Sequence, residues 1–146
     1  MKTPHISVAG IALRGDRVFI ARRVPGGSLG SKWEFPGGKA EAGEGGEEAL
    51  IREFQEEFSL AIRVGEKLGE AAFEHRGLTR SLWAYRIYAD LDESGGSLAL
   101  RCHEAWKWAS IPEIETLDFA PSDLLLLPAL KTYLASRKGA RTGVPC

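Results

Sequence analysis

Cysteine and long apolar runs are scarce in this chain, and each absence excludes a class of protein. The 146 residues include two cysteines, Cys102 and Cys146, which stand far apart. We expect two free thiols in a reducing cytoplasm rather than a disulfide framework. No apolar run approaches the length of about 18 residues that a membrane span needs, so the sequence predicts none. Residues 1–5 lead into a strand-like run and do not resemble a signal peptide.

Charge of one sign is also not in excess. Lys and Arg number 19 and Asp and Glu number 20, which gives a net charge of −1, and no basic stripe is present. A nucleic-acid polymer is therefore not expected as a partner. With 44% apolar and 27% charged residues, the chain has an ordinary globular composition. We expect one domain over residues 1–136, a flexible tail over 137–146, and a monomer or homodimer.

The expected elements are several strands and two helices. The pattern predicts one helix that begins near Gly45 or Gly46, and a second over 124–136 that either kinks at Pro128 or begins at Leu127. Strands are expected over 6–13, 17–23, 61–64, 67–75, 79–91, 98–101 and 106–109. Several strands with two helices fit a layered α/β/α sandwich.

The first helix carries the most informative pattern. Apolar residues at helical spacing predict a face that meets the core: Leu50, Ile51, Phe54 and Phe58. Glu53, Glu56 and Glu57 share a neighbouring arc about 100° wide and repel one another. Either solvation or a hard cation with oxygen ligands would relieve that repulsion. A solvated acidic face is the simpler interpretation, but the carboxylates border an aromatic face, and a Gly-rich turn precedes the helix.

These residues resemble a known family. Gly38, five residues, Glu44, seven residues, then Arg52-Glu53-Phe54-Gln55-Glu56-Glu57 and Leu60 are similar to the Nudix box. The likeness covers roughly residues 3 to 135 and is nearest to the MutT-like branch. It implies an α/β/α sandwich with a mixed central sheet. Ser59 stands where the family usually has Gly, at a helix end that often needs positive φ.

The resemblance implies a metal-dependent site. Mg²⁺, or Mn²⁺ in its place, would be held by the carbonyl of Gly38 and by Glu53, Glu56 and Glu57. Arg52 would orient Glu53, and Glu44 would be structural or lie behind the metal ligands. Two cations near the phosphates, Lys39 and Arg23, are also implied. Glu104 is the candidate for a distal base or ligand, with a surface Glu in a loop as the alternative.

A base pocket is implied by weaker matches outside the box. Phe35 and Asp123 would contact the base, with Ile6 and Trp83 as walls. Phe35 could instead be a simple core residue, and Asp123 could cap the last helix. His5, His75 and His103 show no metal-ligand spacing and are expected to be structural.

The implied activity is that of a pyrophosphohydrolase in the cytoplasm. Its substrate would be a small nucleotide, a nucleoside triphosphate such as 8-oxo-dGTP or a (d)CTP analogue. Nudix enzymes that act on ADP-ribose, coenzyme A or dinucleoside polyphosphates are one alternative; no Pro occurs between Pro36 and Pro112, where the ADP-ribose branch carries one. A domain that senses nucleotides without catalysis is the other, although all three box carboxylates are present.

Overall fold

The structure, a computed structural model, describes residues 5–92, 94–96 and 98–142. Its strands are β1 (Ile6–Ile11), β2 (Leu13–Arg14), β3 (Arg17–Arg23), β4 (Trp33–Glu34), β5 (Gly37–Lys39), β6 (Ile62–His75), β7 (Leu78–Ala89) and β8 (His103–Ala109). Its helices are α1 (Gly46–Phe58), α2 (Ile111–Ile114), α3 (Pro121–Leu124) and α4 (Leu127–Thr142). No helix among these described residues is long and apolar enough to cross a membrane.

The strands within the described ranges form two four-stranded sheets. The first has the order β5-β1-β7-β6 and is mixed, because β1 runs parallel to β7 and antiparallel to β5. In the second, β3 pairs with β2 and β4 along one edge and with β8 along the other. The chain passes between the sheets directly after β1, near Ala12.

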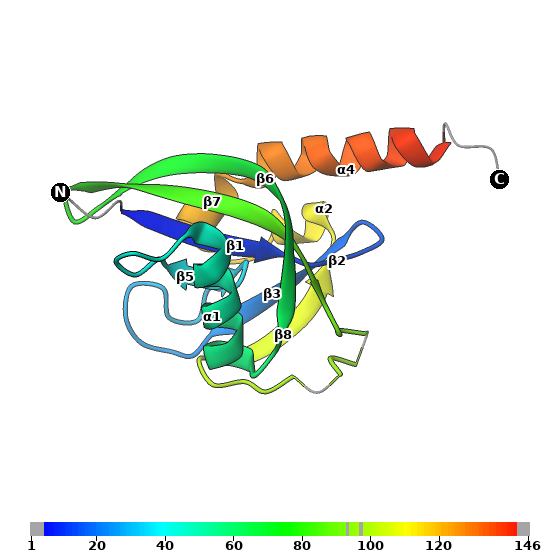
Figure 1. Cartoon of the computed structure of the whole chain (residues 1–146). Coiled ribbons are helices and arrows are strands. Elements are labelled where there is room, and N and C mark those ends of the chain that lie inside the picture. Colours follow the sequence, from blue (N-terminus) through cyan, green and yellow to red (C-terminus); the bar gives the residue numbers. More distant parts are fainter. Residues whose placement is uncertain (1–4, 93, 97, 143–146) are drawn as a thin grey trace.

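Helices lie on both sides of the sheets, as Figure 1 shows. Helix α1 buries Leu50, Phe54 and Phe58 in a cluster with Phe19 of β3. On the opposite face α2 and α4 contribute a second cluster that contains Ile111, Ile114, Leu126, Leu130 and Leu134. The predicted α/β/α sandwich with a mixed sheet is therefore confirmed.

The buried arc of α1 differs from the prediction at one residue. Ile51 was expected to face the core, but 46% of its surface is exposed. The buried arc instead turns toward Glu57, whose exposed fraction is 7%, and toward Ala49. Glu57 thus lies at the edge of the buried arc that faces the second sheet. Ile51 lies at the other edge, which is exposed.

Both ends of α1 follow the sequence. Gly45 is the N-cap, and Glu48 Oε1 accepts a hydrogen bond from its N–H at 3.1 Å. Ser59 ends the helix with φ 53° and ψ 39°, the left-handed conformation expected there. Residues 98–101 do not form the predicted strand. Instead, the N–H groups of Ala99 and Arg101 donate to the carbonyls of Phe58 and Glu57, and so satisfy two orphan acceptors of the last turn.

The C-terminal helix and the long hairpin also differ in extent. Helix α4 begins at Leu127, so Pro128 lies in its first turn, where proline is tolerated. It continues to Thr142, beyond the predicted end at residue 136, and residues 143–146 of the expected tail lie outside the described part. The predicted strands 61–64 and 67–75 form one strand, β6, with register shifts around Lys67.

Candidate active site

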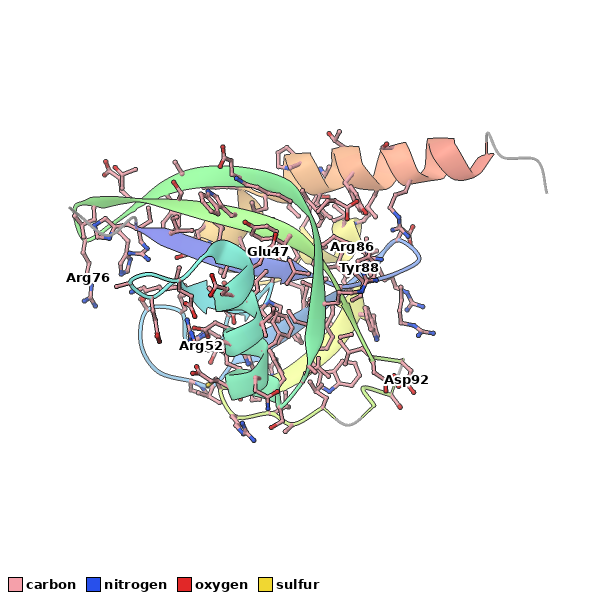
Figure 2. The ribbon with its side chains drawn as sticks, viewed as in Figure 1. Glu47, Arg52, Arg76, Arg86, Tyr88 and Asp92 are labelled. Carbon is pink, nitrogen blue, oxygen red and sulfur yellow. The ribbon has the colours of Figure 1, made fainter. Side chains whose placement is uncertain are left out.

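Arg52 organises the acidic side of α1 (Figure 2). Its Nε donates to Glu44 Oε2 at 2.7 Å and its Nη2 to Glu44 Oε1 at 2.9 Å, a bidentate pair. Its Nη1 lies 2.9 Å from Glu53 Oε1 and 3.2 Å from Glu56 Oε2. Nη2 also donates to the carbonyl of Lys39 at 3.0 Å. One planar guanidinium thus orients Glu53 and joins the helix to the preceding turn.

The charges of this group are unequally compensated. The hydrogen bond from Arg52 lowers the pKa of Glu44 to about 2, and the same bond raises the pKa of Arg52. Burial raises the pKa of Glu53. The pKa of Glu57 is raised to about 8, first by burial and then by the negative charges of Glu34 and Glu53. Glu53 is thus paired with Arg52, whereas Glu57 has no ion pair with a cation among the described residues.

Two glycines allow the turn before α1 to approach the helix. A Cβ on Gly38 would lie 2.5 Å from Glu53 Cδ, and a Cβ on Gly37 would lie 1.9 Å from the carbonyl oxygen of Val8. Only residues without a side chain fit at these positions. The residue whose carbonyl was predicted as a metal ligand therefore lies against one of the predicted carboxylate ligands.

Two residues that sequence reasoning did not assign to the site are buried in it. Glu34 of β4 and His103 of β8 are 7% and 4% exposed, and His103 Nε2 lies 2.7 Å from Glu34 Oε2. The ring of His103 stacks on Phe58, with centroids 5.0 Å apart. The position of Glu34 directly before the predicted Phe35 contact was the available signal for it in the sequence.

The structure does not bring Glu104 to the carboxylates. Its Oε1 accepts from Arg22 Nε at 2.8 Å, and its side chain is exposed. Strand alternation counted back from Trp106, which packs on the α1 side, would place Glu104 there. Arg22 pairs with Ala105 and Arg23 with His103, so Glu104 is the extra residue of a bulge. The bulge turns His103 toward α1 instead.

The predicted base pocket is only partly assembled. Phe35 is 2% exposed, and its N–H donates to Asp123 Oδ2 at 2.9 Å. Asp123 makes no side-chain cap of α3 or α4, so its capping interpretation is wrong. Burial raises the pKa of Asp123 to about 7. Trp83 and Ile6 pack against the α1 cluster, on the opposite face of the sheet from Phe35, and so do not form walls of this pocket.

The two predicted phosphate-side cations occupy different settings. Lys39 is exposed at the end of β5. Arg23 lies at the end of β3, with Nη1 3.5 Å from Glu34 Oε2, and is 36% exposed. Arg23 is thus adjacent to the buried acidic group, and Lys39 is available to an anion that enters from solvent.

The comparison with protein families agrees with this geometry. Residues 3–130 match the model of the NUDIX domain. The chain belongs to the NUDIX family. The predicted family and its hydrolase class are thereby confirmed, over almost the range expected from the sequence. NUDIX hydrolases generally use a divalent metal, and three buried side chains of this chain, Glu34, Glu57 and His103, offer ligand atoms that could hold such an ion.

Named relatives and solved NUDIX structures extend over most of the chain. The CTP pyrophosphohydrolase of Escherichia coli is 32% identical over 130 residues, covering 89% of this chain and 93% of the relative. The 8-oxo-dGTP diphosphatase of the same organism is 33% identical over 134 residues, covering 90% and 98%. The solution structure of the E. coli ORF135 protein has a TM-score of 0.74 at 30% identity and covers 92% of this chain and 91% of that one.

Proposed function

We propose that this NUDIX protein hydrolyses a nucleoside triphosphate to the monophosphate and pyrophosphate, with 8-oxo-dGTP or a CTP analogue as the substrate. The relatives that act on such nucleotides match this chain over at least 89% of its length at 32% and 33% identity. The observation that carries the proposal is the arc of Glu53, Glu56 and Glu57, with Glu57 buried and its Oε2 lacking a hydrogen-bond partner among the described residues.

These carboxylates have the donor chemistry of a hard-cation site. Glu53, Glu56 and Glu57 would hold Mg²⁺, or Mn²⁺, together with the carbonyl of Gly38. When bound, the ion acidifies a water molecule and offsets phosphate charge. The orphan oxygen of Glu57 and its raised pKa are typical of a buried carboxylate that has no counter-cation of its own in the protein.

The protein's own residues supply positioning. Arg52 fixes the rotamer of Glu53 through the 2.9 Å contact. Water oxygen attacks a phosphorus of the triphosphate, the bond to the pyrophosphate oxygen breaks, and a carboxylate of the site takes the proton from water. Arg23 and Lys39 offset the charge of the phosphate oxygens during this displacement.

The Phe35–Asp123 pair would contact the base. Asp123 Oδ2 is engaged by the Phe35 N–H, and Oδ1 has only a weak contact with Ser122 Oγ at 3.4 Å. In its ionised form, above its pKa of about 7, this carboxylate only accepts and so suits the exocyclic amino group of cytosine and the N7–H of 8-oxoguanine. This residue therefore supports both candidate bases and selects neither.

A nucleotide panel tests the proposal. Formation of the nucleoside monophosphate is measured with and without Mg²⁺ for 8-oxo-dGTP, dGTP, CTP, dCTP and 5-methyl-dCTP, and for ADP-ribose and a dinucleoside tetraphosphate as competing substrates. Release of pyrophosphate is followed beside it for the triphosphates. We expect Mg²⁺-dependent turnover of a triphosphate above both competitors. Preferred turnover of a competitor would move the substrate to another NUDIX branch, and binding without any turnover would indicate a nucleotide sensor. Action in the cytoplasm, the monomer or homodimer, and the lack of a nucleic-acid or membrane partner stay predictions.

A further inference from the structure

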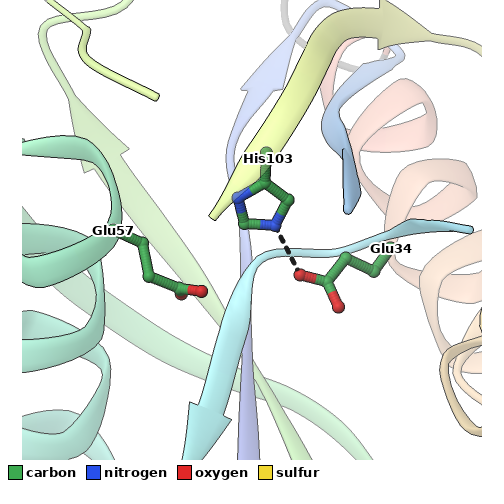
Figure 3. A group of neighbouring side chains, drawn as sticks. All are labelled: Glu34, Glu57 and His103. Atoms are coloured by element: carbon green, nitrogen blue, oxygen red, sulfur yellow. Dashed lines mark hydrogen bonds and ion pairs between the residues drawn. The ribbon is translucent and has the colours of Figure 1, made fainter. Parts of the chain in front are cut away.

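Three buried side chains from three elements converge beside the acidic arc of α1. Glu34 of β4, Glu57 of α1 and His103 of β8 each offer one ligand atom, and these atoms lie within 4.8 Å of one another. Figure 3 shows the side chains directed toward a common region. Each residue is at least nine-tenths buried, with 7%, 7% and 4% of its surface exposed.

The hydrogen bonds of this cluster are incomplete. Glu57 Oε2 and His103 Nδ1 are fully buried and have no hydrogen-bond partner within the described ranges. Buried polar atoms without a partner are rare in folded proteins, and a catalytic role, a bound water or an ion are among the explanations for those that occur. The nearby cation, Arg23, forms an ion pair with Glu34, at 3.5 Å, and none with Glu57 within those ranges.

A purely structural role accounts for only part of the cluster. The contact of 2.7 Å between His103 Nε2 and Glu34 Oε2, with the stacking of the imidazole on Phe58, would serve to hold β8 against β4 and α1. That role gives no reason for the unpartnered Nδ1 of His103, and the proposed Mg²⁺ site, which uses the free oxygen of Glu57, includes neither Glu34 nor His103. Burying an uncompensated carboxylate is expensive, so a ligand that needs all three donors accounts for more of the geometry.

We propose that Glu34, Glu57 and His103 form a cation site for a late first-row transition ion of the Zn²⁺ or Co²⁺ class. Imidazole nitrogen with carboxylate oxygens is the donor set such ions favour, whereas Mg²⁺ favours oxygen alone. Imidazole nitrogen and carboxylate oxygen coordinate in their deprotonated forms, so the ion would replace the hydrogen bond between His103 Nε2 and Glu34 Oε2. A water molecule would complete the coordination.

The two cation sites share Glu57 and are therefore coupled. An ion at the nitrogen-containing site occupies a carboxylate that the proposed Mg²⁺ site also uses, so each ion lowers the affinity for the other. Only this coupling rests on the proposed function. Binding of the transition ion itself does not require any turnover.

Titration of the full chain with Co²⁺ tests the site, followed through the visible absorption of the ion without any nucleotide present. We expect His103→Gln and Glu34→Gln each to lower the affinity for Co²⁺ at least about 10-fold, as loss of metal-site groups commonly does. Two matched controls on β6, His75→Gln at its end and Glu74→Gln on its exposed side, should retain it. Equal Co²⁺ affinity in His103→Gln and His75→Gln would overturn the proposal.

A second measurement uses the unaltered protein, in case a variant at a buried position fails to fold. With ¹⁵N-labelled histidine, added Zn²⁺ should shift the ring nitrogens of His103 and leave those of His75 and His5 in place. A spectrum in which no His103 nitrogen responds to Zn²⁺ would overturn the site, even if the protein hydrolyses nucleotides. Conversely, a His103 shift in a protein without turnover would support the site and contradict only the activity.

Discussion

At the scale of single residues, Arg52 shows how one side chain makes a crowded acidic surface tolerable. Glu44, Glu53 and Glu56 all contact its guanidinium at 3.2 Å or less. Lysine carries the same charge but lacks the planar fork that contacts several carboxylates at once. The effect of Arg52 should therefore depend on its shape as well as on its charge.

We expect Arg52→Lys to raise the pKa of Glu44 from about 2 toward its ordinary value of 4.5. In the unaltered protein that lowered pKa contributes stability that is present above about pH 4.5 and is lost as pH falls toward 2. The variant should lose less stability over that interval. NMR titration of the Glu44 carboxyl carbon and urea unfolding between these pH values measure both effects. Arg76→Lys, at the β6–β7 turn far from the site (Figure 2), is the control and should leave Glu44 unchanged.

Glu57 should matter for activity and not for folding. Replacing it with Gln removes one predicted cation ligand, and we expect turnover to fall on the order of 10²-fold or more, as for other electrostatic groups. The free energy of unfolding should hold or rise, because a buried carboxylate with a raised pKa is replaced by a neutral group. Steady-state kinetics at limiting Mg²⁺, with thermal unfolding beside them, check this. Near-normal turnover of Glu57→Gln would remove Glu57 from the cation site.

Asp123 should give the protein a pH dependence of the opposite sign to that of Glu44. Its pKa is raised to about 7, so the folded state holds a proton that the unfolded state releases near pH 4. Stability contributed by this proton is present at low pH and is lost as pH rises from about 4 to about 7. We expect Asp123→Asn to flatten that decline in urea unfolding.

The same variant tests the base pocket. Asn adds a donor where ionised Asp only accepts, so the ranking of bases on the nucleotide panel should change by roughly 10-fold. If the ranking stays the same and only the pH dependence of stability changes, Asp123 anchors the Phe35 turn and the base contact lies elsewhere.

At the scale of elements, the end of α1 places Ser59, a residue at positive φ, two positions after Glu57, a proposed cation ligand. Ser59 adopts φ 53°, which Gly adopts without strain. We expect Ser59→Gly to stabilise the protein by up to ~1 kcal/mol, measured by urea unfolding. Ser59→Ala keeps the strain of a side chain at positive φ and should show no such gain. Destabilisation by Gly would mean that the hydroxyl of Ser59 contributes more than the strain removes.

Local patterns predicted the elements whose causes are local. Apolar spacing and the Gly45 cap specify α1, and Ser59 occupies the left-handed position that its place after the helix indicated. The segment 98–101 was predicted as a strand, yet the N–H groups of Ala99 and Arg101 donate to the end of α1. Whether these N–H groups donate to a neighbouring strand or to the end of a helix depends on tertiary contacts. The periodicity of the sequence carries no information about those contacts.

At the scale of the whole molecule, the last buried residue of α4 whose side chain the structure describes is Leu134. Leu130 and Leu134 are buried in the core at 2% and 8% exposure. Arg137 donates to the carbonyl of Gly15 at 3.1 Å. We expect a chain ending at Arg137 to unfold within about 0.5 kcal/mol of the full chain and to keep its activity. A chain ending at Ala129 loses both leucines and should be destabilised by several kcal/mol. Loss of folding in the chain that ends at Arg137 would show that residues after 137 belong to the domain.

The site was predictable as far as its residues lie close together in sequence. Helical spacing placed Glu53, Glu56 and Glu57 on one surface with Arg52 beside them, whereas Glu44 was assigned through the family resemblance. Glu34 and His103 come from strands that are brought together by pairing with β3. Trp83 and Ile6 were assigned to the wrong face because composition does not tell which face of a sheet a side chain occupies.

The bulge in β8 decides which chemical group reaches α1. Two neighbours in the chain, an imidazole and a carboxylate, compete for one position beside Glu57, and the register of β8 against β3 gives it to His103. Straightening the strand there would present Glu104 and turn a nitrogen-containing ligand set into one of oxygen alone. Ion preference in this protein is thus a property of strand alignment. An insertion or deletion of one residue near Arg22 or Ala105 could change it without any substitution among the ligands.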